Sequence, residues 1–352
     1  MFLGVRNAFI RSSNRLLSSS KKPRGAPPPK PDVDIYTNPT GKYLDTFMKY
    51  HGNDRSVFKK EDIVQWINSF DEYTFKLTCL KGTDKAIGVS HFCTFYPIEG
   101  SGNLEPIVFT GFGWTHPEHR QMQYLKLQHD ICYEVIPSEK INVISHINEP
   151  ARKFWHLMIG LKENEGLGHR TADVQYKSVY DAKNLVVPRD LDIKGITVKS
   201  AKDVPAKEII EYDQTIHPYH REKYIISHMY DRDGFGKVAY DEDGKVIGIG
   251  QAIIYNNKKD CNLGPIYADE PRVAQAMFKE MLQDIKDSGK FVSQFEIRST
   301  QKSVNSFHWM DAFLQCEPNR SHVCNLVYKH WAPKNVGFDK VYCPTHAQLF
   351  IV

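Results

Sequence analysis

The sequence has no paired cysteines. Its seven cysteines are scattered over positions 79, 93, 132, 261, 316, 324 and 343, and no two of them have the C-x-x-C spacing. Structural zinc sites and disulfide frameworks show themselves by such spacings, so we expect neither and interpret the cysteines as buried free thiols. No apolar run is long enough for a membrane-spanning helix, and no short repeat or heptad pattern is visible. These absences leave a globular protein without a membrane span as the prediction.

The first 31 residues have no acidic side chain. They hold seven Lys and Arg residues, and serine is abundant between positions 12 and 20. An acid-free start rich in Arg and Ser is typical of a mitochondrial transit peptide, and Arg15-Leu-Leu17 resembles a matrix-protease cleavage site. The alternative is a disordered basic tail. Without residues 1–17 the formal net charge of +4 falls to +1, so the basic excess does not indicate a nucleic-acid-binding protein.

The remaining chain is long enough for two domains. A proline-rich spacer, Ala26-Pro-Pro-Pro-Lys-Pro31, cannot be helical, and from about residue 42 the sequence looks globular. Roughly 310 residues exceed what one core usually supports. Each half opens with a strand, a tight turn and a strand, with turns at residues 81–84 and 241–244. We therefore predict residues 1–31 as transit peptide and spacer, and domains at 42–180 and 195–352, separated near 181–194.

Residues 106–160 are the most informative part of the first half. A strand at 106–115 leads into His116-Pro-Glu-His-Arg120 and a helix, and a strand at 141–147 leads into Asn148-Glu-Pro-Ala151 and Phe154-Trp155. Before them the periodicity predicts a helix at 61–70 and strands at 74–79 and 86–95. This order and these motifs resemble the acetyl-CoA-binding core of the GNAT N-acetyltransferase superfamily. The resemblance implies an α+β fold of two tandem GNAT-like domains, each a mixed, mostly antiparallel sheet flanked by helices.

The same resemblance implies acetyl-CoA as co-substrate. In GNAT enzymes the end of the fourth strand splays from its neighbour and binds the amide-bearing arm of the cofactor, and Gly111-Phe-Gly113 is compatible with a bulge there. The alternative is that these glycines relieve crowding. The following turn holds the pyrophosphate at a helix start. The residues that the resemblance places against the cofactor are Gly113, Trp114, Thr115, Arg120, Gln121, Met122, Gln123, Tyr124, Leu125 and Asn148.

The phosphate turn departs from the family pattern. Gln123 and Leu125 stand where the family has glycines, and their side chains would crowd a phosphate that approaches the backbone closely. Arg120 could make a charged contact with the phosphates, and a surface arginine is the alternative.

The expected proton-transfer groups also differ. GNAT enzymes commonly place a tyrosine that protonates the thiolate after the fifth strand, and this sequence has Trp155 there. His146, on the fifth strand, is the nearest candidate base because its unperturbed pKa is about 6.5; a structural histidine is the alternative. Proximity alone can also supply much of the acceleration.

The second half resembles the YitH/HolE type of GNAT domain. The segment Tyr212-Asp213, Ile216, Pro218 and Arg221 and the strand end Gly264–Asp269 carry this resemblance. It implies Asp213, Arg221 and Asp269 as substrate-binding residues, although Asp269 precedes Pro271 and a helix and is also placed to cap that helix. Arg298 to Asn305 lies where a fifth strand would end. No phosphate-loop glycines follow Asp269, so we expect this domain to shape the acceptor site.

The sequence thus predicts a mitochondrial, acyl-CoA-dependent N-acyltransferase that uses acetyl-CoA and acts on a small amine or amino acid admitted between the domains. One alternative is a glycine N-acyltransferase-like enzyme with longer acyl-CoAs. The other is a catalytically degenerate GNAT module that binds a ligand or a protein partner, which the lost glycines and Trp155 favour.

Overall fold

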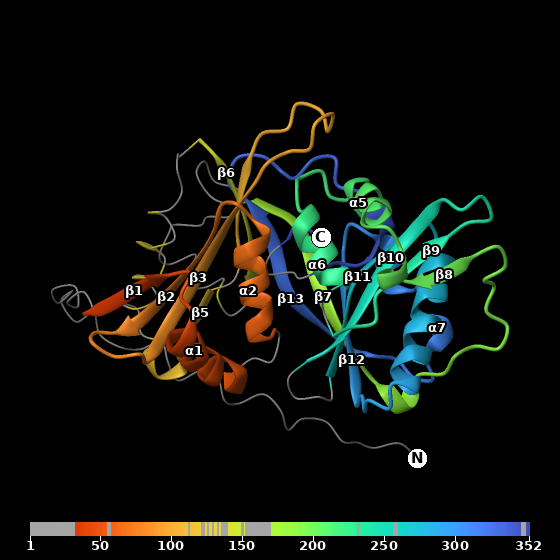
Figure 1. Ribbon diagram of the computed structural model, residues 1–352, viewed down its shortest axis with the longest axis horizontal. Coiled ribbons are helices and arrows are strands. Elements are labelled where there is room, and N and C mark those ends of the chain that lie inside the picture. The colour runs from red at the N-terminus through yellow and green to blue at the C-terminus, as the bar shows by residue number, and fades with distance from the viewer. Residues whose placement is uncertain are drawn as a thin grey trace, which may run out of the picture.

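The computed structural model describes most of the chain between residues 32 and 352 (Figure 1). The described residues are 32–54, 58–111, 113–120, 124, 127–128, 130–131, 134, 140–148, 151, 170–230, 233–255, 260–345 and 350–352. The sequence-based predictions for Gln121, Met122, Gln123, Leu125 and Trp155 lie outside these residues, as does the N-terminal segment 1–31.

The first half begins with a strand and two helices and continues with short and long strands. Its helices are α1 (Gly41–Asp54) and α2 (Lys60–Ser69). Its strands are β1 (Val33–Thr37), β2 (Tyr73–Leu80), β3 (Ala86–Phe95), β4 (Ile107–Thr110), β5 (Gly113–Thr115), β6 (Asn142–Asn148) and β7 (Arg170–Asp181).

The second half follows the same order of strands; one long strand replaces the divided fourth strand of the first half and one strand is added at the end, so each half has seven described strands. Its helices are α5 (Ala206–Gln214), α6 (Glu222–Tyr230) and α7 (Pro271–Asp287). Its strands are β8 (Thr197–Ser200), β9 (Lys237–Tyr240), β10 (Val246–Ile254), β11 (Asp260–Ala268), β12 (Gln294–Thr300), β13 (Asn319–Tyr328) and β14 (Val341–Cys343).

Apolar periodicity and turn residues explain most of these elements. The strand predicted at 86–95 has these bounds in the structure, and β9 ends directly before the turn predicted at 241–244. Gly82 and Gly244 have φ values of 68° and 78° in the two hairpin turns, a backbone region that glycine adopts without a steric penalty. The strand predicted at 106–115 is divided into β4 and β5. The fold begins earlier than expected, because β1 at Val33–Thr37 pairs with β2.

All strands belong to one sheet of fourteen strands. Its order is β1-β2-β3-β4-β6-β13-β7-β12-β11-β10-β9-β8, with β5 on β3 and β14 on β11. Most pairs are antiparallel, and β4–β6 and β11–β12 are parallel. The mixed, mostly antiparallel sheet and the flanking helices confirm the predicted α+β fold class.

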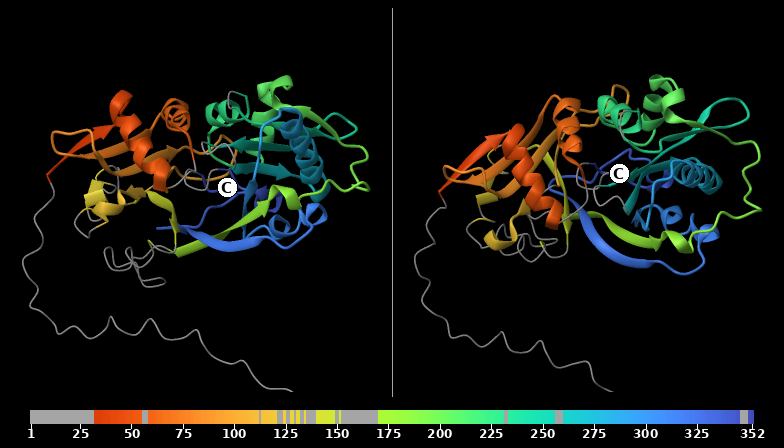
Figure 2. Two further views of the ribbon diagram at one scale, coloured as in Figure 1. Left: turned by 90° about the horizontal axis from the view of Figure 1, so that it is seen from below. Right: turned by 60° about the horizontal axis from the view of Figure 1, so that its bottom comes forward.

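The two halves exchange strands at the centre of the sheet. β13, from the second half, lies between β6 and β7, while β7, from the first half, lies between β13 and β12. Figure 2 shows these two long strands side by side in both views. Hydrogen-bonded pairing therefore crosses the boundary near residues 181–194, and the domain limits drawn from the sequence stay a prediction.

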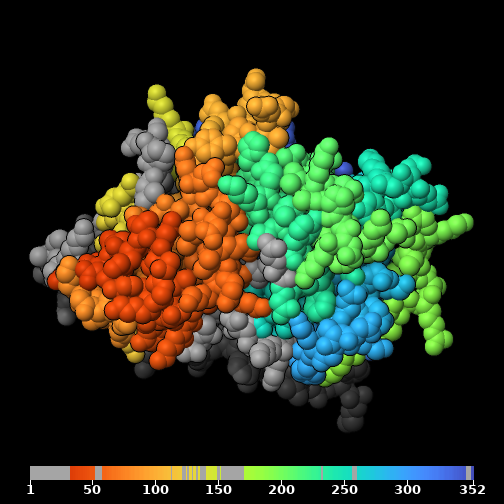
Figure 3. Space-filling model, in the orientation of Figure 1, coloured from red at the N-terminus to blue at the C-terminus, as the bar shows by residue number. Residues whose placement is uncertain are grey.

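The helices of the two halves meet on one face of the sheet. α1, α2, α5 and α6 pack into a single core in which Phe70 of the first half stacks on Tyr224 of the second, with ring centroids 5.9 Å apart. α7 packs on the other face of the second half, where Met277 and Phe278 belong to a separate core. The space-filling view shows the surfaces of the two halves in contact (Figure 3). Among the described residues, no helix is long and apolar enough to cross a membrane.

Candidate active site

A β-bulge divides the fourth strand of the first half. Between the pairs Cys93–Phe109 and Ser90–Gly113, β3 advances three residues while the opposite chain advances four. The extra residue lies within residues 110–112, which overlap Gly111-Phe-Gly113, the segment whose glycines are compatible with a bulge. The Gly111 N–H donates a hydrogen bond of 3.2 Å to Nε2 of the buried His91. His91 therefore holds the bulge from the neighbouring strand.

Beyond the bulge the sheet opens. β4 and β6 are paired from Ile107–Asn142 to Thr110–Ser145, and then β5 continues along β3 without pairing with β6. The edges of β5 and of the last residues of β6 thus face each other with backbone groups that no described strand uses. An extended, amide-bearing ligand can add to such edges as a strand would. We define this opening between β5 and Ile147–Asn148 as the first splay.

The equivalent opening in the second half is filled by the chain itself. β11 and β12 are paired from Asp260–Gln294 to Asn262–Glu296, and further on β11 pairs with β14 instead. Gly264, with φ of 145°, marks the change, and a Cβ there would lie 2.5 Å from the Pro344 carbonyl oxygen. The Cys343 thiol donates to the Leu263 carbonyl at 3.0 Å. No room is left for a second extended ligand between β11 and β12.

His146 lies next to the closed end of the first splay. It follows Ser145, the last residue of β6 that pairs with β4, and its side chain is 8% exposed. The edge of its ring meets Phe109, with centroids 5.5 Å apart, and within the described part of the chain neither ring nitrogen has a hydrogen-bond partner. Burial, helped by the positive charge of Arg298, lowers the pKa of His146 to about 3. The imidazole is therefore neutral near pH 7 and can accept a hydrogen bond from an incoming N–H.

The predicted cofactor residues around β5 have different environments. Gly113 is exposed, and a Cβ would meet nothing within 4 Å, so the backbone is accessible there. Trp114 is buried against Phe47, and Thr115 is almost buried. The indole of Trp114 therefore packs in the core, and these two residues can offer a ligand only their backbone.

The turn after β5 begins as a short 3₁₀ helix, Pro117–His119. The exposed Arg120 folds back, and its Nε–H donates to the Thr115 carbonyl at 3.0 Å. Tyr124 is half-buried with its ring 5.2 Å from that of His119. Asn148 accepts the Ala151 N–H at 3.0 Å, so its oxygen fixes the start of the next segment.

The segment after the turn is anchored to the sheet through Gln128. The side-chain oxygen of Gln128 accepts from Ser90, and its nitrogen donates to Thr78. A Cβ on Gly88 would lie 2.5 Å from that nitrogen. A glycine at this position lets the glutamine reach Ser90 and Thr78 on two neighbouring strands, which anchors residue 128 to the sheet.

One group of possible metal ligands exists among the described residues. Ligand atoms of His116, Glu118 and His119 lie within 4.8 Å of one another. Nδ1 of His116 already accepts the backbone N–H of Glu118 at 3.3 Å, and the Glu118 carboxylate is 3.5 Å from Lys85. These contacts account for the cluster without an ion, and we assign no metal to it.

Asp213 and Arg221 are buried in the core. Their side chains are 3% and 1% exposed and form a two-pronged ion pair, with N–O distances of 2.9 and 2.6 Å. Arg221 also donates to Tyr267, Thr345 and the Val352 carbonyl. The polar groups that the sequence assigns to substrate binding are thus hydrogen-bonded within the protein. Their role in substrate binding stays a prediction.

The alternative role of Asp269 as a helix cap is wrong. Glu270 occupies the cap position of α7, without a side-chain hydrogen bond. Asp269 lies 2.8 Å from Lys340 and accepts from the Tyr212 hydroxyl at 3.0 Å. Its partners come from α5 and from the segment before β14, far away in sequence.

Two family models match the chain. The model described as "Protein of unknown function (DUF1248)" matches residues 30–216, and the model described as "Acetyltransferase (GNAT) domain" matches residues 209–308. None of the curated proteins matches the sequence.

Several solved structures share the fold. A putative acetyltransferase from Pyrococcus horikoshii is 14% identical, with a TM-score of 0.55 over 90% of this chain and 96% of its own. A tandem GNAT protein from the clavulanic acid biosynthesis pathway is 10% identical, with a TM-score of 0.58 over 86% and 100%. N-myristoyltransferase of Saccharomyces cerevisiae with bound myristoyl-CoA is 12% identical, with a TM-score of 0.56 over 95% and 88%. These likenesses show that the chain has the tandem GNAT fold.

Proposed function

We propose that this protein, which belongs to the DUF1248 family of proteins of unknown function and has the tandem GNAT fold, is an acyl-CoA-dependent N-acyltransferase. The observation that carries the proposal is the contrast between the two halves: the first splay offers free strand edges, and its counterpart is filled by β14. The acyl-CoA arm would therefore bind in the first half. The second half, with its YitH/HolE-like motifs, would shape the acceptor side.

The reaction that fits this geometry is the transfer of an acyl group from a thioester to an amine. The amine nitrogen attacks the thioester carbonyl, the C–N bond forms, the C–S bond breaks, and the proton lost by the amine balances the charge of the departing thiolate. His146 can accept a hydrogen bond from the amine and so orient its lone pair. Its lowered pKa makes it a weak base, so orientation is the larger contribution we assign to it.

Acetyl-CoA and a small amine or amino acid are the proposed co-substrate and acceptor. Calorimetric titration of the full chain with acetyl-CoA tests the proposal directly, and we expect saturable binding. The same titration with longer acyl-CoAs tests the alternative, because a glycine N-acyltransferase-like enzyme would bind them more tightly. Absence of binding at millimolar ligand would instead leave a degenerate GNAT module as the better explanation.

The phosphate turn provides a mutational test. Changing Gln123 and Leu125 together to glycine is expected to tighten acetyl-CoA binding, because it removes two side chains from the path of the phosphates. A steric block of about 1.4 kcal/mol corresponds to roughly a tenfold change in dissociation constant. Glycine costs up to about 1 kcal/mol per residue in a helix, so circular dichroism must accompany the calorimetry. Arg120→Ala in this background should weaken binding, and the loss should shrink at high salt. If neither variant alters the affinity of a folded protein, this turn does not face the cofactor.

We further propose that the protein acts in the mitochondrial matrix, from the acid-free, Arg- and Ser-rich residues 1–31. A reporter fused to these residues is expected to enter mitochondria and to be cut near Leu17. Cytosolic residence of the fusion with an intact N-terminus would contradict this localisation.

A further inference from the structure

Polar side chains gather on one face of the four central strands. Residues directly opposite each other on antiparallel strands point to the same face, and the register aligns them in three rows. The rows are His146–Leu326–Asp173, then Asn148–Cys324–Gln175–Thr300, and then Lys177–Arg298. This is the face on which α2 and α6 meet, since Leu326 belongs to their core. We call these residues the central polar face.

Two members of the central polar face have buried nitrogen atoms without a hydrogen-bond partner among the described residues. His146 has both ring nitrogens unpaired, and Gln175, which is 0% exposed, has an unpaired Nε2. The Oε1 atom of Gln175 accepts a weak hydrogen bond from the Cys324 thiol, at 3.7 Å. Buried polar groups are normally hydrogen-bonded, because leaving one unpaired costs free energy. His146 and Gln175 lie on the same face, on strands separated by β13, so an unpaired acceptor and an unpaired donor both face that side of the sheet and indicate a polar ligand.

Arg298 adds a positive charge that no hydrogen bond engages. Its guanidinium has one carboxylate neighbour among the described residues, Glu296, at 3.8 Å. Glu296 is engaged by Lys177, whose Nζ lies 3.2 Å from its other oxygen. The carboxylate of Asp173 accepts from the Thr300 hydroxyl and from the Lys302 N–H. The carboxylates of Glu296 and Asp173 thus have partners, and the guanidinium of Arg298 is available to bind a ligand.

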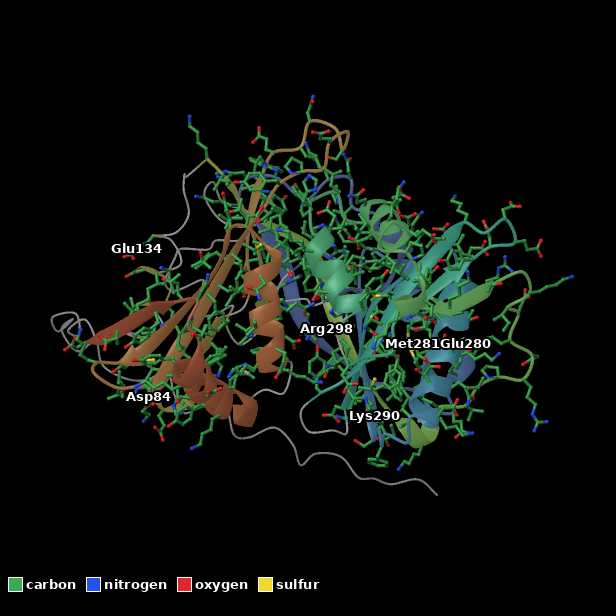
Figure 4. The ribbon with its side chains drawn as sticks, in the orientation of Figure 1. Asp84, Glu134, Glu280, Met281, Lys290 and Arg298 are labelled. Atoms are coloured by element: carbon green, nitrogen blue, oxygen red, sulfur yellow. The ribbon has the colours of Figure 1, made fainter. Side chains whose placement is uncertain are left out.

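Arg298 and His146 come from different halves of the chain, and the register places them on the same face of the sheet, on strands separated by β13 and β7. The charge of Arg298 acts on His146 and on Cys324 between them. Figure 4 places Arg298 in the middle of the molecule, between the two halves. A guanidinium binds a carboxylate through two parallel hydrogen bonds. One small molecule can therefore meet Arg298 at one end and His146 at the other.

We propose that the central polar face binds the acceptor, and that the acceptor is an amino acid with its carboxylate on Arg298 and its amine against His146 and Gln175. The proposal rests on the proposed acyl transfer, because the closed end of the first splay brings the thioester beside His146. Strand exchange makes this site possible: β6 and β7 come from the first half, and β12 and β13 from the second.

The test compares acceptors with and without a carboxylate. The full chain is incubated with acetyl-CoA and with each standard amino acid or its carboxamide, and the acetylated product is measured. We expect kcat/KM for at least one amino acid to exceed that for its amide by about tenfold or more, the usual scale of lost charge-assisted hydrogen bonds. Equal rates for acid and amide, or acetylation of amides alone, would overturn the proposal.

Arg298→Gln is the matching variant. We expect it to raise KM for the amino acid about tenfold or more with a smaller change in kcat, because carboxylate binding is lost in ground and transition states alike. Arg298→Lys, which keeps the charge, should retain part of the affinity and serves if the glutamine variant folds poorly. Arg320→Gln is the control, since Arg320 is paired opposite Ser178 and so lies on the other face of the sheet.

Acetyl-CoA affinity separates failure of this inference from failure of the proposed function. Arg298→Gln should leave the acetyl-CoA dissociation constant unchanged. If the protein binds acetyl-CoA and no amino acid in the panel is acetylated, the acceptor assignment is wrong while the cofactor assignment stands. If acetyl-CoA does not bind, both are wrong.

Discussion

Lowering the pH from 7 to 5 is expected to reduce the free energy of unfolding by about 4 kcal/mol through two buried histidines alone. Burial lowers the pKa of His146 to about 3 and that of His228 to about 4. In the unfolded chain each imidazole has a pKa near 6.5 and is protonated at pH 5, whereas in the folded protein it stays neutral at that pH. Their stability contribution is therefore complete above pH 6.5 and is lost as the pH falls toward 4 and 3. His217, with a pKa held well below its usual value by burial, acts in the same direction.

Urea unfolding at several pH values between 7 and 5 measures this loss. The window excludes carboxylates whose pKa values are lowered, such as those of Asp34 and Glu222, because they titrate below it. His217→Phe is a matched variant, since the ring would stay among Phe95, Tyr219 and Phe350. In this variant the free energy of unfolding should depend less steeply on pH, because one fewer proton is taken up on unfolding. A stability that does not change between pH 7 and pH 5 would mean that these histidines are hydrated.

The sequence predicts much of the fold because local signals and global structure agree there. The hairpin glycines and the alternation in β3 and β9 give the strand bounds, and Gly111-Phe-Gly113 indicates the bulge that opens the sheet. The motif at 106–160 then identifies the first splay from residues that are close in sequence. These features need no knowledge of distant parts of the chain.

The rest depends on contacts between distant residues, which no local pattern encodes. The apolar and polar alternation of β13 does not say that it lies between β6 and β7. The sequence places Arg298 at the end of a fifth strand, but its position on the same face as His146 follows only from the strand exchange. His91 looks like an ordinary strand histidine, and the bulge opposite it was the one signal that could have identified it. β14 was missed because three residues are too short for a periodicity.

Removing the carboxylate of Asp213 is expected to cost about 3–5 kcal/mol of folding free energy, the usual cost of leaving one partner of a buried ion pair uncompensated. In Asp213→Ala, the guanidinium of Arg221 stays buried and loses its side-chain carboxylate; the Tyr267 and Thr345 hydroxyls and the main-chain oxygen of Val352 are its remaining printed contacts. Urea denaturation of wild type and variant at pH 7 measures the loss.

Two further variants separate the charge effect from packing. Asp213→Leu combined with Arg221→Met removes both charges, and we expect it to recover most of the stability, because apolar residues of similar volume often replace buried pairs without loss. Glu211→Ala, on the same helix, breaks the exposed pair with Lys207 and should change stability by less than about 0.5 kcal/mol. If Asp213→Ala costs no more than Glu211→Ala, the pair is accessible to water and its groups are available to a ligand. That result would favour the substrate-binding role that the sequence assigns to Asp213 and Arg221 over the structural role that their burial indicates.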